Sequence, residues 1–241
     1  MSSESTLLIS RCFLAGLGTQ MFVHREDRIP QESPVLVVSN HRSFLDPVLL
    51  TAALGRSIRF ACHHYMGQVP LIREVVTTFG AFPLEAPEQR QQHFFSQATA
   101  LLQSGEMVGV FPEGAEPMVN FTKPNTVGKF QRGFAHLALR APVRDLAVLP
   151  VAIGSMEEQS VRSGVPLKLL SLFDPSEPLF DRAGWHPVII YQRVNVLIGR
   201  PYWITVDRQQ QYRGKKAKAV VAELTDHCQG EIAELLQRGC L

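Results

Sequence analysis

The sequence predicts an α/β fold, a single domain with a largely parallel central sheet flanked by helices. Short apolar runs rich in β-branched or aromatic residues alternate along the chain with longer segments of helical period. The short runs are bounded by Gly, Pro or Asn, as buried strands commonly are. At 241 residues the chain is long enough to bury one core, and no internal repeat divides it.

Six runs are expected to form strands because each is short and apolar and is followed by turn-forming residues. They are Val35–Ser39, Ile58–Cys62, Ala81–Leu84, Met107–Phe111, Val148–Ile153 and the longer Val188–Ile198. Ligands of α/β proteins bind in the loops at the carboxyl ends of the strands. The functional site is therefore expected in the loops that follow these runs.

Three segments carry their apolar residues on one helical face. They are Glu88–Ser104, which stops at Gly105, then Lys129–Arg140, and a long closing helix over Lys215–Arg238. The segment Ser155–His186 breaks the alternation because it mixes charges, prolines and an apolar stretch. It is interpreted as a lid or a lipid-contact segment.

The amino end is expected to lie on a membrane surface. Leu7–Val23 is apolar but contains Arg11 and Gln20, so its uninterrupted run is shorter than the roughly 20 residues that span a bilayer. No signal-peptide cleavage pattern follows it. Residues 1–30 are assigned to an amphipathic, membrane-associating interfacial helix and 31–241 to the main domain. A helix that caps the protein's own core is the alternative.

Composition excludes several classes of partner. A formal net charge of +2 is far below the basicity of a nucleic-acid binder, so no nucleic acid is expected. The four cysteines have no CxxC spacing, which argues against a zinc site and a disulfide framework and favours a reducing cytosolic compartment. The apolar lean, 45% hydrophobic against 19% charged residues, suits contact with lipid. Oligomeric state has no signature in the sequence.

The turn after the first predicted strand combines a histidine with a carboxylate. Val35–Ser39 runs into Asn40 and His41, and Ser43 and Asp46 follow. Positions five apart on a regular helix point away from each other, so His41 and Asp46 meet only if the backbone turns between them. Asp46 would then hold the imidazole in one tautomer and leave its other nitrogen free to take a proton from a hydroxyl. A histidine that caps the next helix or packs in the turn is the alternative to a general base.

A second strand ends in a complementary polar turn, since Met107–Phe111 is followed by Pro112, Glu113 and Gly114. Glu113 could bind an acceptor hydroxyl or help to position the base. Gly114 would let backbone N–H groups approach an oxyanion or a phosphate. A tight turn with a solvated Glu113 is the alternative.

Taken together, NHRSFLD at 40–46 and FPEG at 111–114 resemble the paired signature blocks of the glycerol-phosphate and lysophospholipid acyltransferase superfamily. LPVAIG at 149–154 is similar to a later strand block of that family, and Pro150 matches its proline. The resemblance extends from Val35 to Gly154 and, more loosely, to residues 198–201.

The resemblance implies an O-acyltransferase that moves a fatty acyl group from acyl-CoA or acyl-carrier protein to a lysophospholipid hydroxyl in phospholipid synthesis. Its default acceptor is 1-acylglycerol-3-phosphate. The family's general base and its carboxylate partner carry over to His41 and Asp46, and the acceptor-holding block carries over to Phe111, Pro112, Glu113 and Gly114. The family implies no metal, no cofactor beyond the acyl co-substrate and no covalent acyl-enzyme. It also implies a peripheral protein on the cytoplasmic face of a membrane, with membrane lipids as partners.

Three positions depart from the family pattern. Relatives that use glycerol phosphates commonly follow FPEG with a hydroxyl residue and an arginine, where this chain has Ala115 and Glu116, and Ala86 replaces a further arginine. Basic residues that might substitute are Arg73, Arg90, Lys123, Lys129 and Arg132, while His63 and His64 lie near where relatives often carry a lysine. The alternatives are therefore a less anionic lipid alcohol as acceptor, a non-catalytic lipid-binding relative, and a hydrolase with Ser43 beside the base.

Overall fold

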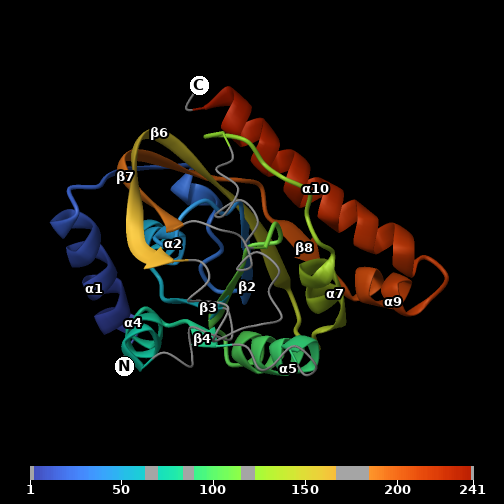
Figure 1. Cartoon of the computed structure of the whole chain (residues 1–241). Helices are drawn as coiled ribbons and strands as arrows, with labels where there is room; N and C mark the ends of the chain where they lie inside the picture. Colours follow the sequence, from blue (N-terminus) through green and yellow to red (C-terminus); the bar gives the residue numbers. More distant parts are fainter. Residues whose placement is uncertain (1–2, 63–69, 84–89, 115–122, 167–184, 240–241) are drawn as a thin grey trace.

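The structure, a computed structural model of the chain, describes residues 3–62, 70–83, 90–114, 123–166 and 185–239 (Figure 1). Within these ranges one sheet has the strand order β1-β7-β6-β2-β5-β3-β4, and β8 pairs with β6. The strands are β1 (Gln20–His24), β2 (Val35–Ser39), β3 (Ile58–Cys62), β4 (Phe82–Pro83), β5 (Met107–Val110), β6 (Leu146–Pro166), β7 (Trp185–Ile198) and β8 (Tyr202–Ile204).

Parallel pairing dominates the sheet. β2 pairs in parallel with β5 and β6, β3 with β4 and β5, and β1 with β7. The antiparallel pairs are β6 with β7 and β6 with β8. The predicted α/β class with a largely parallel sheet is confirmed. β2 is buried along its whole length, as its continuous apolar run predicts for a strand covered on both faces.

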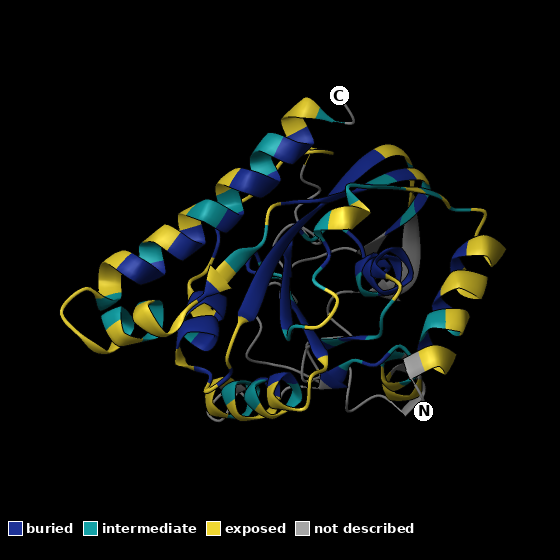
Figure 2. Ribbon diagram, turned by 180° about the vertical axis from the view of Figure 1, so that it is seen from behind, coloured by how far each residue is buried: buried dark blue, intermediate teal, exposed yellow. Residues whose placement is uncertain are grey.

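Helices cover both faces of the sheet. They are α1 (Ser3–Gly16), the 3-10 turn η1 (Glu26–Arg28), α2 (Asp46–Leu54), α4 (Pro70–Thr78), α5 (Arg90–Gln103), α7 (Gly133–Arg140), α9 (Val206–Arg213) and α10 (Ala217–Arg238). Val35 and Val37 of β2 belong to one core cluster with residues of α1 and α2. Leu36 and Val38 point the other way, into a cluster with α5, α7 and α10. Figure 2 shows the buried strands between helices whose outer faces are exposed.

Most predicted elements match the structure within a few residues. The runs at 35–39 and 58–62 are β2 and β3, and the three predicted helices are α5, α7 and α10 with later starts. The expected lid over Ser155–His186 is wrong for its described part. Residues 155–166 continue β6 and 185–186 begin β7, and the two strands form one long antiparallel hairpin. Its exposed residues, which include Met156, Glu157 and Gln159, obscure the apolar pattern of a strand. Residues 167–184 lie outside the described ranges.

The amino end is shorter as a helix than Leu7–Val23 predicts. α1 ends at Gly16, Gly18 adopts φ +71°, and Gln20–His24 becomes the edge strand β1, so the sheet begins before residue 31. Leu14 is buried against the core, whereas Leu8, Phe13 and Leu17 are exposed. The helix thus packs on the protein and also presents an apolar outer face. Among the described helices, none has the length and apolar character needed to cross a bilayer.

Gly109 on β5 is a packing requirement, because a Cβ at this position would lie 2.1 Å from a ring carbon of Phe60. Gly109→Ala is expected to lower the free energy of unfolding by about 1–3 kcal/mol through overpacking. Urea denaturation measures the change. Gly133→Ala is the control, since a Cβ there meets nothing within 4 Å and should leave stability unchanged or slightly higher. Equal stability of the two variants would contradict the packing argument.

Candidate active site

The chain turns sharply between β2 and α2, and this turn brings His41 and Asp46 together. His41 follows the carboxyl end of β2, and Asp46 is the first residue of α2. The Asp46 backbone N–H donates to the Ser43 carbonyl at 3.0 Å, which closes the turn. As a result His41 Nδ1 lies 2.8 Å from Asp46 Oδ2. The bend that the spacing of five residues required is present at the strand-to-helix junction.

Asp46 is completely buried and accepts four hydrogen bonds. Oδ2 accepts from His41 Nδ1 and from the backbone N–H groups of Arg42, at 2.7 Å, and Ser43, at 2.9 Å. Oδ1 accepts from the Tyr191 hydroxyl at 2.7 Å. A carboxylate is an acceptor only, so these contacts place the imidazole proton on Nδ1. The four donors offset the cost of removing the carboxylate from water.

The other imidazole nitrogen, Nε2, is left as a proton acceptor. Among the described residues none hydrogen-bonds to it, and the His41 side chain is 11% exposed. Phe111 stacks on the imidazole with ring centroids 3.9 Å apart and planes at 10°, and Phe60 stacks on Phe111 at 5.0 Å. The ring is therefore held on one face and at Nδ1, with Nε2 able to take a proton from a hydroxyl.

Glu113 binds the backbone of the histidine. Its Oε1 accepts from the His41 backbone N–H at 3.1 Å, and its Oε2 accepts from the Gly128 N–H at 2.5 Å. Burial raises the pKa of Glu113, and these two N–H groups counteract part of the rise. With only 7% exposure, Glu113 is not a solvated turn residue. Of the two roles considered for it, its contacts are those of a group that positions the base.

The backbone donors around the site are largely used within the protein. The N–H of Gly114, which adopts φ +73°, donates to the Phe111 carbonyl at 3.0 Å. The N–H groups of Arg42 and Ser43 donate to Asp46, and that of His41 donates to Glu113. Hence these four groups are not free to bind an oxyanion. The expectation that Gly114 brings a free N–H to the reacting atoms is wrong.

Asn40 and Ser43 tie the turn to neighbouring strands. Asn40 donates to the Ile153 carbonyl at 3.0 Å and accepts from the Ile153 N–H at 2.8 Å, which extends the β2–β6 pairing by one side chain. The Ser43 hydroxyl donates to the Ile189 carbonyl at 2.6 Å and accepts from the Leu45 N–H at 3.1 Å. Both side chains are buried, so both act on the shape of the turn.

Three further predicted positions lie apart from the dyad. Pro112 is buried, and its carbonyl accepts from the Gln131 N–H at 2.9 Å. Pro150 pairs with Val38 in the β2–β6 ladder, and its carbonyl accepts from the Gly199 N–H at 2.8 Å. Arg90 is the first residue of α5, and its side chain lies outside the described part.

The candidate phosphate-binding cations are not all placed. Lys123, Lys129 and Arg132 are exposed on the segment between β5 and α7, and Lys129 follows Gly128, which contacts Glu113. Arg73 is exposed on α4. The departures at 86, 115 and 116 and the histidines at 63 and 64 lie outside the described residues.

Sequence reasoning missed two contacts of the turn, both from the β6–β7 hairpin. One is the Tyr191 bond to Asp46. The other is a bidentate pair in which Arg42 Nε donates to Glu158 Oε2 at 2.9 Å and Nη2 to Oε1 at 2.5 Å. The hydrogen bond from Glu158 raises the pKa of Arg42 further. A tyrosine within an aliphatic strand was the sole local signal.

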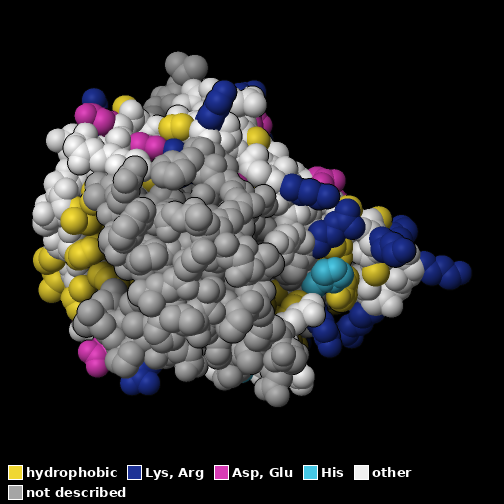
Figure 3. All heavy atoms as spheres, in the orientation of Figure 1, with side chains coloured by type: hydrophobic (Ala, Val, Ile, Leu, Met, Phe, Trp, Pro, Cys, Tyr) yellow, Lys and Arg dark blue, Asp and Glu magenta, His cyan; other side chains and the backbone are white. Residues whose placement is uncertain are grey.

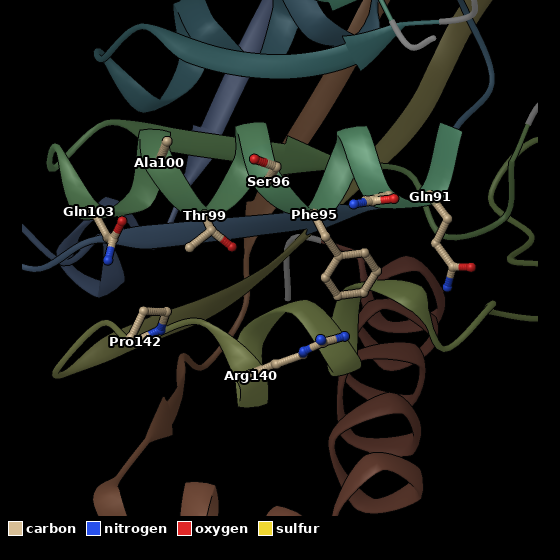
Figure 4. A pocket seen from close by; sticks show the side chains of 9 residues that line it. Gln91, Phe95, Ser96, Thr99, Ala100, Gln103, Arg140 and Pro142 are labelled. Atoms are coloured by element: carbon tan, nitrogen blue, oxygen red, sulfur yellow. The ribbon is translucent and has the colours of Figure 1, made fainter. Parts of the chain in front are cut away.

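A groove of about 740 Å³ lies between α5 and α7 (Figure 4). The Arg140 guanidinium carbon lies 5.9 Å from the Phe95 ring centroid within it. The lining includes none of residues 40–46 or 111–114, so the groove is separate from the dyad.

A parallel sheet with a histidine–aspartate dyad at the carboxyl end of a central strand defines an α/β enzyme site. A family model described as Acyltransferase matches residues 20–154, more than half of the chain. The chain belongs to this acyltransferase family.

Similar proteins agree with this membership. The chloroplastic 1-acyl-sn-glycerol-3-phosphate acyltransferase LPAT1 of Arabidopsis thaliana is 30% identical over 123 residues, 51% of this chain and 32% of that protein. The match thus spans about a third of the plant protein. A 1-acyl-sn-glycerol-3-phosphate acyltransferase of Borreliella burgdorferi is 21% identical over 181 residues, 73% of this chain and 69% of that protein.

A solved structure shares the fold. The crystal structure of the 1-acyl-sn-glycerophosphate (LPA) acyltransferase PlsC from Thermotoga maritima superposes with a TM-score of 0.63. The superposition covers 98% of this chain and 78% of that one, at 16% identity.

Glu113→Gln tests whether Glu113 positions the base. The amide places an NH₂ group against one of two backbone N–H donors, so the backbone at His41 should shift and the acyl-transfer rate should fall about 10- to 100-fold. Steady-state kinetics measures the loss. Glu106→Gln makes the same change on a 45% exposed side chain and should leave the rate unchanged. Full activity of Glu113→Gln would exclude a positioning role.

Proposed function

We propose that this protein is an O-acyltransferase that moves a fatty acyl group from an acyl thioester to a lysophospholipid hydroxyl, with 1-acylglycerol-3-phosphate as acceptor. The observation that carries the proposal is the His41–Asp46 dyad with a free Nε2, in a chain of the acyltransferase family. The names of the plant and bacterial relatives support the acceptor.

The proposed reaction is a direct transfer. The acceptor hydroxyl gives its proton to His41 Nε2 as its oxygen attacks the thioester carbonyl. Asp46 stabilises the imidazolium that forms. The tetrahedral intermediate collapses with cleavage of the carbon–sulfur bond, and the imidazolium returns its proton to the departing thiolate. The products are the ester and the free thiol, and the enzyme is regenerated without a covalent intermediate.

The acceptor's phosphate needs a cation. Arg42 is the basic residue nearest the base in sequence, but Glu158 already binds it through two hydrogen bonds. Lys129 is exposed beside Gly128 and thus close to Glu113, so it is the best-placed candidate among the described residues. The neutralised Arg42, together with Ala86, Ala115 and Glu116, favours a less anionic lipid alcohol as the second candidate acceptor.

A serine hydrolase has less support from the contacts. The Ser43 hydroxyl is buried and donates to the Ile189 carbonyl, so His41 does not activate it. A non-catalytic lipid-binding role would leave the dyad's buried donors and free Nε2 without use. The donor, acyl-CoA or acyl-carrier protein, is left to the assay.

Membrane association at the cytoplasmic face is part of the proposal. Hydrophobic side chains gather on the α1 side of the molecule (Figure 3), where Leu8 is 64% exposed and Phe13 and Leu17 are also exposed. An amphipathic helix with such a face can lie in the headgroup region and bring the site to its lipid acceptor.

His41→Ala should abolish acyl transfer, with a loss of about 10²- to 10⁴-fold, because the variant lacks the general base. Purified protein is incubated with oleoyl-CoA or palmitoyl-carrier protein and with lysophosphatidic acid, glycerol 3-phosphate, a neutral lysolipid or no acceptor. Mass spectrometry identifies the products. His227→Ala, a histidine on α10 far from the dyad in sequence, is the matched control and should retain activity.

The outcomes separate the candidates. Acylated lysophosphatidic acid supports the proposal, and product with the neutral acceptor alone supports the second candidate. Thiol release without acceptor indicates hydrolysis. A fully active, folded His41→Ala protein would refute the mechanism.

The double variant Leu8→Gln/Leu17→Gln should weaken binding to vesicles of phosphatidylethanolamine and phosphatidylglycerol, because it removes two exposed apolar side chains from α1. Vesicle flotation measures the bound fraction. Val206→Gln is the control, since Val206 is 59% exposed but lies on α9. Unchanged flotation of the double variant would refute the role of α1.

A further inference from the structure

We propose that Tyr191 is a positioning residue for the His41–Asp46 dyad, and that the β6–β7 hairpin evolved into part of the active site by carrying it. The inference rests on the proposed general-base function of His41. Tyr191 lies beyond residue 154, where the family match ends, so it is a feature of this chain outside the matched region.

The two oxygens of Asp46 have different partners, and this division fixes the carboxylate. Oδ2 serves His41 and two backbone N–H groups, while Oδ1 has the Tyr191 hydroxyl at 2.7 Å. Within the described residues, Tyr191 is the one hydrogen-bond partner of Oδ1. Without the hydroxyl, a buried oxygen would lose its donor and the carboxylate could rotate toward another one. The direction of the bond to His41 Nδ1 would then vary.

Tyr191 is itself rigidly held. It is fully buried, and its backbone carbonyl accepts from the Thr19 hydroxyl at 2.8 Å. Its partner across the hairpin is Glu158, the residue that binds Arg42. Two residues before it, the Ile189 carbonyl accepts from Ser43. The hairpin thus contacts the catalytic turn at three successive points, through Arg42, Ser43 and Asp46.

The hydroxyl of Tyr191 donates throughout the pH range of catalysis. Burial and the neighbouring Asp46 charge raise the pKa of Tyr191 well above its ordinary value, so its proton stays in place. The other charged groups around the dyad are Glu113, Arg42 and Glu158. Removing the donor leaves the Asp46 charge less compensated, and the dyad then holds a proton more tightly. The acid limb of the pH–rate profile should move to higher pH.

The test is Tyr191→Phe compared with Tyr202→Phe in the full-length protein. Tyr202 also donates to a carboxylate, Glu223 at 3.1 Å, but on the exposed side of α10. Tyr191→Phe should lower kcat about 10- to 100-fold with little change in KM, as loss of an orienting partner of a functional histidine does. The acid limb of kcat/KM should rise by about half to one pH unit. Tyr202→Phe should match the wild type in both.

The assay is run at a temperature where circular dichroism shows all three proteins fully folded, so a loss of stability does not imitate a loss of positioning. Unchanged kcat and acid limb in Tyr191→Phe would overturn the inference. So would a fall in kcat with an unmoved acid limb, or equal losses in both variants, because each would indicate a general structural effect. A wild-type protein that transfers no acyl group to any acceptor would instead refute the proposed function.

Discussion

The site depends on one buried carboxylate. Asp46 has no contact with water, and a charge in such a place must be paired and hydrogen-bonded. Its donors come from the turn that follows β2, from the imidazole of His41 and from β7. Because all of them must converge on one group, the turn, the central strand and the hairpin have to be placed together. The orientation of the histidine is a consequence of this requirement.

The strand order explains how these groups reach a single point. β2 lies between β5 and β6, and β7 is the next strand beyond β6. β5 therefore delivers Phe111 and Glu113 to one side of the turn, and the β6–β7 hairpin delivers Glu158 and Tyr191 to the other. The turn is held from both sides, while Nε2 of His41 has no hydrogen bond from any described residue.

Much of the fold was predictable because the central strands are continuous apolar runs. β2 and β3 match their predicted bounds, since strands buried on both faces have a clear local signal. The long hairpin was not predictable, because residues 155–166 mix exposed and polar side chains that show neither period. β1 was read as part of a helix because an edge strand of five residues and an amphipathic helix share the same apolar content.

The sequence by itself determined the fold class, the family resemblance and the pairing of His41 with Asp46, because these depend on short runs of neighbouring residues. Only the tertiary structure decided what surrounds that pair. It turned Glu113 toward the backbone of His41, bound Arg42 to Glu158 and brought Tyr191 to Asp46 across 145 positions of the chain. Contacts between residues so far apart arise from strand order and register, and no local pattern of residues encodes them.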